Sequence, residues 1–92
     1  MPAPHYQFTG LILLSSEDKP GIEDSLRATL EPFTLEIREV QKIALRGRLI
    51  LGMLIALDPA HASAVAEDIE AFSLQTGLDV AIDFSVADSD YN

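Results

Sequence analysis

The chain has 92 residues, enough for one small domain with a single core. Its 15 acidic and 6 basic residues give a formal net charge of −9, opposite in sign to the basic surface that nucleic acids and anionic membranes attract. Cysteine is absent, which excludes disulfides, thiolate metal sites and a cysteine nucleophile. The first residues lack the pattern of a signal peptide, and the longest apolar run, 49–57, is too short to cross a bilayer. We therefore expect a cytoplasmic protein that binds neither nucleic acid nor membranes.

The first half of the chain predicts a strand and then a helix. The apolar run 8–14 is bounded by two serines, as is typical of a strand. Asp18 is expected to cap the helix, with Pro20 in its first turn and Pro32 just beyond its end. The apolar residues of this helix recur every four positions and are Ile22, Leu26 and Leu30.

The middle of the chain predicts a hairpin over 35–57. Its apolar alternation slips near Glu39 to Gln41, which indicates a bulge or bend. Arg46 and Gly47 are expected to form the turn, with the glycine supplying a positive φ.

A second helix and a last strand follow the hairpin. Asp58 and Pro59 predict the start of the helix and Gly77 its end. Its apolar residues recur at three- and four-residue steps and are Ala62, Val65, Ile69 and Phe72. Strict alternation over 78–86 predicts a strand that is half-buried.

The resulting order, β-α-β-β-α-β, predicts an α+β fold, a ferredoxin-like sandwich with a four-stranded antiparallel sheet and two helices on one face. We expect one domain over 1–92, with its core at about 8–86 and a tail or start of a linker at 87–92. The first and third strands are apolar on both faces, as central strands are. That pattern predicts an apolar sheet face that pairs with another copy or a neighbouring domain. The alternative is that a few apolar residues simply remain exposed.

Two groups of polar residues are candidate anion sites. The loop 15–21 leads into a helix N-terminus, whose free N–H groups suit a carboxylate or phosphate, although ordinary turn chemistry explains the same residues. Four of the six basic residues lie in the hairpin, at Arg38, Lys42, Arg46 and Arg48. Three of them share a parity and could gather an anion, whereas protection of an edge strand explains them without any ligand.

No catalytic residue, metal ligand or cofactor is predicted for this chain. His5 and His61 are isolated, and no serine has a histidine base at a suggestive position. The Asp-x-Asp pair at 88–90 is interpreted as part of the tail, because a phosphatase domain would have to follow it. Acylphosphatase chemistry would need an asparagine, and the chain has only Asn92. RNA recognition is disfavoured because the third strand carries no aromatic residue.

Two blocks of sequence resemble known domains. The stretch Asp18-Lys19-Pro20-Gly21-Ile22 resembles the Asp-x-Pro-Gly signature of ACT domains, which sense small molecules and share this order of elements. The block 40–54, with its Arg-x-Arg-Leu turn and Leu-Gly-x-Leu strand, is similar to the N-terminal ACT region of bacterial phosphoserine phosphatases. The resemblance covers roughly residues 8–86.

This resemblance implies a regulatory domain that binds an amino acid where two domains pair, with L-serine as the expected ligand. The implied binding residues are Asp18, Lys19, Pro20, Gly21 and Ile22 in the loop, and Glu39 and Gln41 on the second strand of a partner. Lys42 departs from the family pattern, which has a neutral amide there. Mg²⁺ is expected only in a downstream phosphatase domain, and the partner is a second copy or a neighbouring domain. The alternative is a dimerisation module of a metabolic enzyme that binds no ligand.

Overall fold

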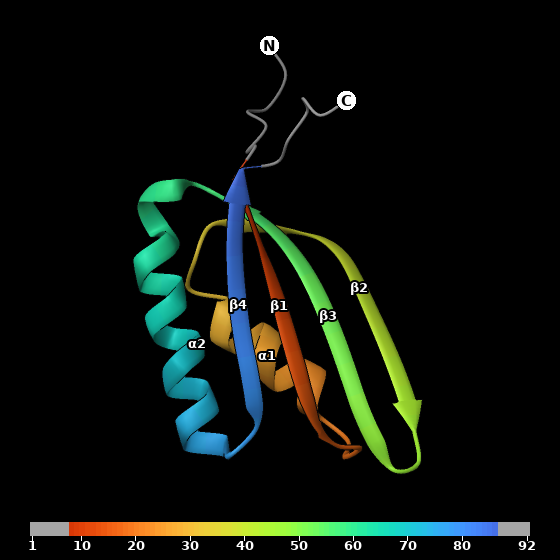
Figure 1. The fold of residues 1–92 in the computed structure, drawn as a ribbon. Coiled ribbons are helices and arrows are strands. Elements are labelled where there is room, and N and C mark those ends of the chain that lie inside the picture. Colours follow the sequence, from red (N-terminus) through yellow and green to blue (C-terminus); the bar gives the residue numbers. More distant parts are fainter. Residues whose placement is uncertain (1–7, 87–92) are drawn as a thin grey trace.

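The secondary structure follows the predicted order in the computed structural model, which describes residues 8–86 (Figure 1). The predicted tail at 87–92, the Asp-x-Asp pair within it and His5 lie outside these residues. The elements are β1 (Phe8–Glu17), α1 (Ile22–Leu30), β2 (Leu35–Leu45), β3 (Arg48–Leu57), the short 3-10 helix η1 (Pro59–His61), α2 (Ala62–Thr76) and β4 (Asp79–Val86).

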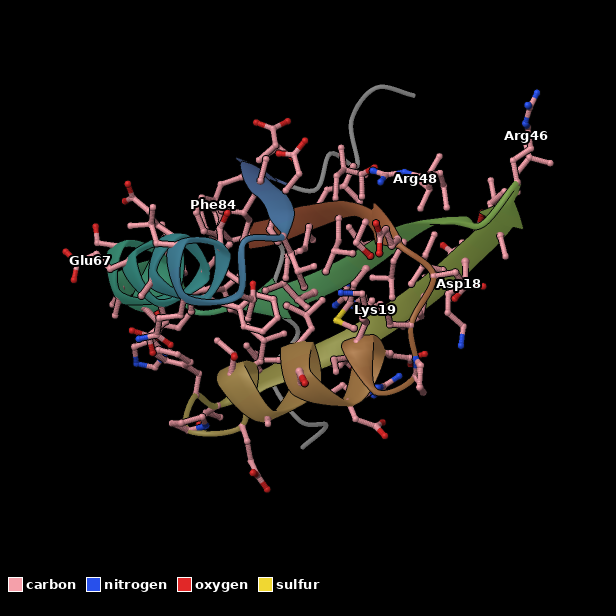
Figure 2. The ribbon with its side chains drawn as sticks, turned by 90° about the horizontal axis from the view of Figure 1, so that it is seen from below. Asp18, Lys19, Arg46, Arg48, Glu67 and Phe84 are labelled. Atoms are coloured by element: carbon pink, nitrogen blue, oxygen red, sulfur yellow. The ribbon has the colours of Figure 1, made fainter. Side chains whose placement is uncertain are left out.

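The four strands form one antiparallel sheet in the order β2-β3-β1-β4. The two strands that are apolar on both faces, β1 and β3, are therefore the central ones, as predicted. Both helices pack on the same face of the sheet, which the view along the strands shows most clearly (Figure 2). This arrangement confirms the ferredoxin-like α+β sandwich.

The core lies between the sheet and the two helices. Its fully buried large side chains are Ile12, Leu14, Leu26, Leu30, Leu51, Met53, Ile55, Leu57, Val65 and Ile69. They come from alternate positions of β1 and β3 and from the inward faces of both helices, as the spacing predicted. Burial of each such side chain contributes on the order of 1.5–3 kcal/mol, so this layer supplies most of the driving force for folding.

The start of α1 differs from the prediction. The helix begins at Ile22, its N-cap is Gly21 with φ 86°, and no side chain caps it. Asp18 is not the cap, because its backbone N–H donates to the carbonyl of Gly47 at 2.9 Å and so belongs to a loop held against the β2–β3 turn. Pro20 consequently precedes the helix. Glycine suits position 21 because a side chain disfavours this left-handed conformation.

The predicted end of the second helix at Gly77 is confirmed, but its start differs: α2 begins at Ala62 with His61 as its N-cap, and Asp58 and Pro59 belong to the short 3-10 helix before it. The Asp58 carboxylate accepts a hydrogen bond from the Ala60 N–H at 2.9 Å, and Pro59 opens the 3-10 turn that leads into α2. Gly77, with φ 75°, ends α2. The buried residues of α2 are Val65, Ile69 and Phe72.

The β2–β3 hairpin contains both predicted irregularities. The turn residues Arg46 and Gly47 have φ values of 55° and 75°, as in a type I′ turn. The pairing register of β2 with β3 shifts between Ile37 and Glu39, so Arg38 is the extra residue of a bulge. The bulge moves every later residue of β2 to the opposite side of the sheet from the one that regular alternation would give. It therefore decides on which side Glu39 and Gln41 lie.

Candidate functional site

The sheet surface away from the helices, called here the open face, is largely apolar at its centre. The residues of this face follow from the strand registers and are Glu17, Ser15, Leu13, Leu11 and Thr9 on β1, Arg48, Ile50, Gly52, Leu54 and Ala56 on β3, Leu45, Ile43, Gln41 and Glu39 on β2, and Asp79, Ala81, Asp83 and Ser85 on β4. Six large apolar side chains are exposed in the described part of the chain, and five of them lie on this face: Leu11, Leu13, Ile43, Leu45 and Ile50. The predicted apolar sheet face is therefore present.

The five predicted loop residues come together around a cavity of about 300 Å³ at the N-terminus of α1. Ile22 is buried in its wall, and the other four, residues 18–21, are exposed. The first backbone bond of α1 runs from the Ser25 N–H to the Gly21 carbonyl, so the N–H groups of the preceding residues have no partner within the helix. The cavity also receives Lys42 from β2, and its rim carries both signs of charge.

Glu23, in the first turn of α1, contacts two cations: Lys42 on β2 and Arg27 one turn further along the same helix. Its carboxylate accepts a hydrogen bond from Lys42 Nζ at 2.9 Å and contacts the Arg27 guanidinium, also at 2.9 Å. Hydrogen bonds from Lys42 and then from Arg27 lower the pKa of the Glu23 carboxyl. The same bond to Glu23 raises the pKa of Lys42. Lys42, the residue that departs from the family pattern, therefore neutralises an acid of this chain on the helix side of the sheet.

Glu39 and Gln41 lie on the other side of the sheet. They line a hollow of about 290 Å³ on the open face, together with Leu11, Leu13, Gly52 and Leu54. The Gln41 side-chain amide donates to the Glu39 carboxylate at 2.6 Å. The predicted ligand-binding residues of one chain thus fall into two separate groups, one at the loop cavity and one on the open face.

The basic residues of the hairpin do not converge on one anion site. Arg38 forms an ion pair with Glu36 at 3.0 Å, and Lys42 is held by Glu23. Arg48 points to the side of the sheet away from α1 and donates to the Ser15 hydroxyl at 3.1 Å, while Arg46 projects from the turn (Figure 2). The prediction that Arg38, Lys42 and Arg46 share one face assumed regular alternation, which the bulge at Arg38 interrupts.

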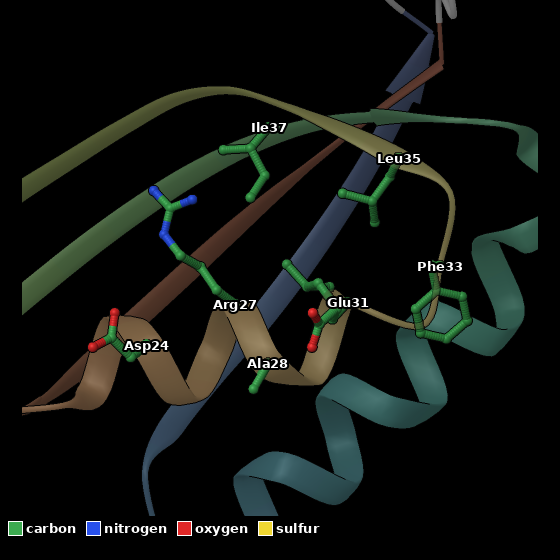
Figure 3. Close-up of a pocket in the computed structure, with 8 residues that line it drawn as sticks. Asp24, Arg27, Ala28, Glu31, Phe33, Leu35 and Ile37 are labelled. Carbon is green, nitrogen blue, oxygen red and sulfur yellow. The ribbon is translucent and has the colours of Figure 1, made fainter.

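A groove of about 560 Å³ lies between α1 and β2, and the sequence did not predict it (Figure 3). Leu35 and Ile37 form its sheet side, and Phe33 closes one end. Asp24 and Glu31 stand on the helix side. The groove exists because α1 has only 9 residues and leaves part of the 11-residue edge strand uncovered.

Within residues 8–86, no cluster of three or more acidic or histidine side chains is arranged to hold a metal ion. His61 is partly buried, and its Nδ1 has no hydrogen-bond partner among the described residues. No helix of the described part is long and apolar enough to span a membrane.

Comparison with known proteins places the chain in a family. The family model for the ACT domain matches residues 10–83. Phosphoserine phosphatase SerB2 of Mycobacterium tuberculosis is 38% identical over 77 residues, which are 82% of this chain and 19% of that protein. The chain therefore spans about a fifth of the length of this relative.

Solved structures share the fold at low sequence identity. A proposed glycine cleavage system transcriptional repressor superposes with a TM-score of 0.81 at 12% identity, over 94% of this chain and 52% of that one. An ACT domain protein from Streptococcus pneumoniae gives a TM-score of 0.72 at 17% identity, over 84% and 89% of the two chains. The matched family model and the shared fold agree: the chain belongs to the ACT domain family.

Proposed function

We propose that this chain is the amino-acid-sensing regulatory domain of a phosphoserine phosphatase and that it binds L-serine, or a related amino acid, between two paired domains. The observation that carries the proposal is the division of the candidate site into two groups that line separate cavities. One domain cannot place both groups around the same ligand, because they lie on opposite sides of its sheet, so a site built from both takes the loop of one domain and β2 of another. The 38% identity to a phosphoserine phosphatase supports the choice of ligand.

The two groups offer complementary chemistry for an amino acid. The N–H groups at the start of α1, which have no partner within the helix, suit an α-carboxylate. The carboxylate of Glu39 from the second domain suits the α-ammonium, and Gln41 offers a neutral amide for a hydroxyl. A ligand that bridges two domains stabilises the paired state, which is how binding would be transmitted to an attached enzyme.

Isothermal titration calorimetry with L-serine tests this proposal. We expect saturable heat at millimolar or lower ligand concentration, with D-serine as the control ligand. Glu39→Gln removes the charge that faces the α-ammonium and should weaken binding by about tenfold or more. The matched control Glu67→Gln changes an exposed carboxylate on α2 and should bind as the wild type does. Absence of heat with L-serine at millimolar concentration would refute the ligand.

A ligand-free dimerisation module is the second candidate, and the exposed apolar residues of the open face favour it. The two functions differ in one measurable way. A sensing domain associates more tightly when L-serine is added, whereas a purely structural module has the same dimer dissociation constant with and without it. Sedimentation equilibrium in the two buffers separates them.

The chemistry of the longer enzyme is also part of the proposal. Hydrolysis of the phosphoserine ester and any Mg²⁺ would belong to a phosphatase domain attached to this one, and the enzyme would act in the cytoplasm. A protein that joins this chain to such a domain should hydrolyse phosphoserine with a rate that L-serine changes, and the isolated chain should not.

A further inference from the structure

Lys42 brings a positive charge from β2 to the loop cavity. Two lysines line this cavity, Lys19 from the loop itself and Lys42 from the neighbouring strand. The Lys19 side chain is 64% exposed and makes a long contact, 3.9 Å, with Glu17 at the end of β1. Lys42 reaches the first turn of α1 instead, where its Nζ is 2.9 Å from the Glu23 carboxylate.

The first turn of α1 carries two negative charges at the same cavity. Glu23 and Asp24 both line it, and acids at this end of a helix are favoured by the helix dipole. The same two charges oppose an anionic ligand, because a carboxylate bound at the start of the helix would lie close to both of them. A cavity that takes the α-carboxylate of an amino acid therefore needs a nearby cation to offset these acids.

Each oxygen of the Glu23 carboxylate is engaged by one cation. Oε1 accepts a hydrogen bond from Lys42 Nζ at 2.9 Å, and Oε2 accepts from the Arg27 guanidinium at 2.9 Å and 3.0 Å. Together the three side chains carry one net positive charge. A neutral residue at position 42 would leave them with none.

The positive charge of Lys42 also acts on Asp24. The hydrogen bond and the charge of Glu23 are the main reasons that the pKa of Lys42 is raised, and the charge of Asp24 raises it as well. The Lys42 ammonium is therefore close enough to both acids of the first turn to offset their charge.

We propose that Lys42 is a positioning residue of the loop cavity, which holds Glu23 toward β2 and offsets the acidic first turn of α1, so that the cavity accepts a carboxylate. This inference rests on the proposed function, because it concerns the same site. It adds that β2 serves ligand binding twice. Glu39 and Gln41 face the ligand held by the loop of a second domain, and Lys42 tunes the cavity of its own domain.

Four variants test this role by changing the charge at the cavity. Lys42→Gln removes a positive charge and should weaken the binding of a carboxylate by about three- to tenfold at low ionic strength. Glu23→Gln removes a negative charge and should strengthen binding by a similar factor. The double variant Glu23→Gln/Lys42→Gln has the local net charge of the wild type and should bind as the wild type does, and so should Lys42→Arg, which keeps the charge.

Amide NMR with sodium acetate measures carboxylate binding whether or not L-serine is the natural ligand. The N–H resonances of residues 21–24 are followed as acetate is added, with sodium chloride at the same ionic strength as the reference. In about 1 M sodium chloride the wild type and Lys42→Gln should converge, because the Debye length falls to about 3 Å. A loss of binding that comes from altered structure would persist at high salt.

The matched controls make the same changes of net charge away from the cavity. Arg46→Gln removes a positive charge at the tip of the hairpin turn, and Glu67→Gln removes a negative charge on α2 (Figure 2). Both should bind acetate as the wild type does. Amide resonances that respond equally in the wild type, Lys42→Gln and Glu23→Gln, or that respond in none of them, would overturn the proposal.

Calorimetry with L-serine separates failure of this inference from failure of the proposed function. Saturable heat with the same affinity in the wild type and in Lys42→Gln would keep the proposed function and refute the role of Lys42. An acetate response in the expected order of variants, without heat from L-serine, would support the role of Lys42 and refute L-serine as the ligand.

Discussion

The two faces of the sheet use the same strands and the same residue types for different purposes. Ile12 and Leu14 point toward the helices and are at most 1% exposed, whereas Leu11 and Leu13, their immediate neighbours in β1, are 38% and 49% exposed. Apolar residues on the helix-covered face provide the free energy of folding. Apolar residues on the open face provide little of it, so their presence points to association.

Two glycines, one on each face of β1 and β3, show the same difference between the packed face and the open face. Gly10 lies on the helix-covered face of β1, where an added Cβ would come within 3.0 Å of the Phe84 ring and 3.1 Å of Ile82. Gly52 lies on the open face, where an added Cβ has ordinary contact only with Leu13. One glycine is needed by the packed structure of the monomer and the other leaves a hollow at its surface.

Truncation of one leucine on each face should give the largest difference. Leu51→Ala removes a fully buried side chain and should lower the free energy of unfolding by about 2–5 kcal/mol. Leu13→Ala should lower it by less than about 1 kcal/mol, because water already reaches this side chain in the monomer. Urea denaturation at a concentration low enough to keep both variants monomeric measures the difference. If both variants lost the same free energy of unfolding, the two faces would contribute equally to stability, and the contrast between them would be wrong.

Alanine at Gly10 should lower the stability of the monomer, whereas alanine at Gly52 should affect only its association. Gly10→Ala is expected to destabilise the monomer by about 1 kcal/mol, since the Phe84 ring must move from its stack on Phe8. Gly52→Ala should leave the free energy of unfolding within about 0.5 kcal/mol of the wild type, because the added methyl group has only ordinary contact with Leu13. It should weaken pairing through the open face, because the methyl group changes the shape of the hollow at its centre. Thermal unfolding and sedimentation velocity on the same samples report the two effects. A Gly52→Ala chain that pairs more tightly would contradict a role for this hollow in pairing.

The smallest expected effect concerns the ion pair between Glu23 on α1 and Lys42 on β2. The lowered pKa of Glu23 means that its ionised form stabilises the fold. This contribution is fully present above the ordinary carboxyl pKa of 4.5 and is lost as the pH falls through the lower pKa of the folded state. Glu23→Gln should therefore cost about 0.5 kcal/mol at neutral pH, because the site is partly exposed, and less at acid pH.

Urea denaturation at several pH values, with Glu67→Gln as the control, checks this expectation. The control should differ little from the wild type at any pH. Lys42 affects stability at alkaline pH instead. Because its pKa is raised, its protonated form stabilises the fold below its ordinary pKa of 10.5, and this stabilisation is lost as the pH rises through the higher pKa of the folded state. A Glu23→Gln penalty that grows on acidification would show that the ion pairs do not stabilise the fold.

Most of the fold could be predicted because hydrophobic spacing depends on the sequence alone. The central position of β1 and β3, the core residues of α1 and the turn at Arg46-Gly47 all followed from periodicity or from turn chemistry. The helix cap at Asp18 was predicted wrongly. Local propensity favours aspartate as a cap, but the contact of its backbone with Gly47 comes from a hairpin that lies far along the chain.

The candidate site was harder to predict because the bulge at Arg38 decides which residues of β2 share a face. A one-residue shift exchanges the two faces of a strand. It places Glu39 and Gln41 on the open face and directs Lys42 toward Glu23 on the other. The groove beside α1 was missed because it depends on the relative lengths of two packed elements, which have no local pattern.

Methyl NMR with a soluble paramagnetic agent tests most directly whether the open face is an interface. At high protein concentration the methyl groups of Leu13 and Ile50 should be shielded from the agent, and on dilution they should become accessible. Leu74 on α2 should be accessible throughout, and Leu51 in the core should be shielded throughout. Methyl groups of Leu13 and Ile50 that remain as accessible as Leu74 at every concentration would contradict the account.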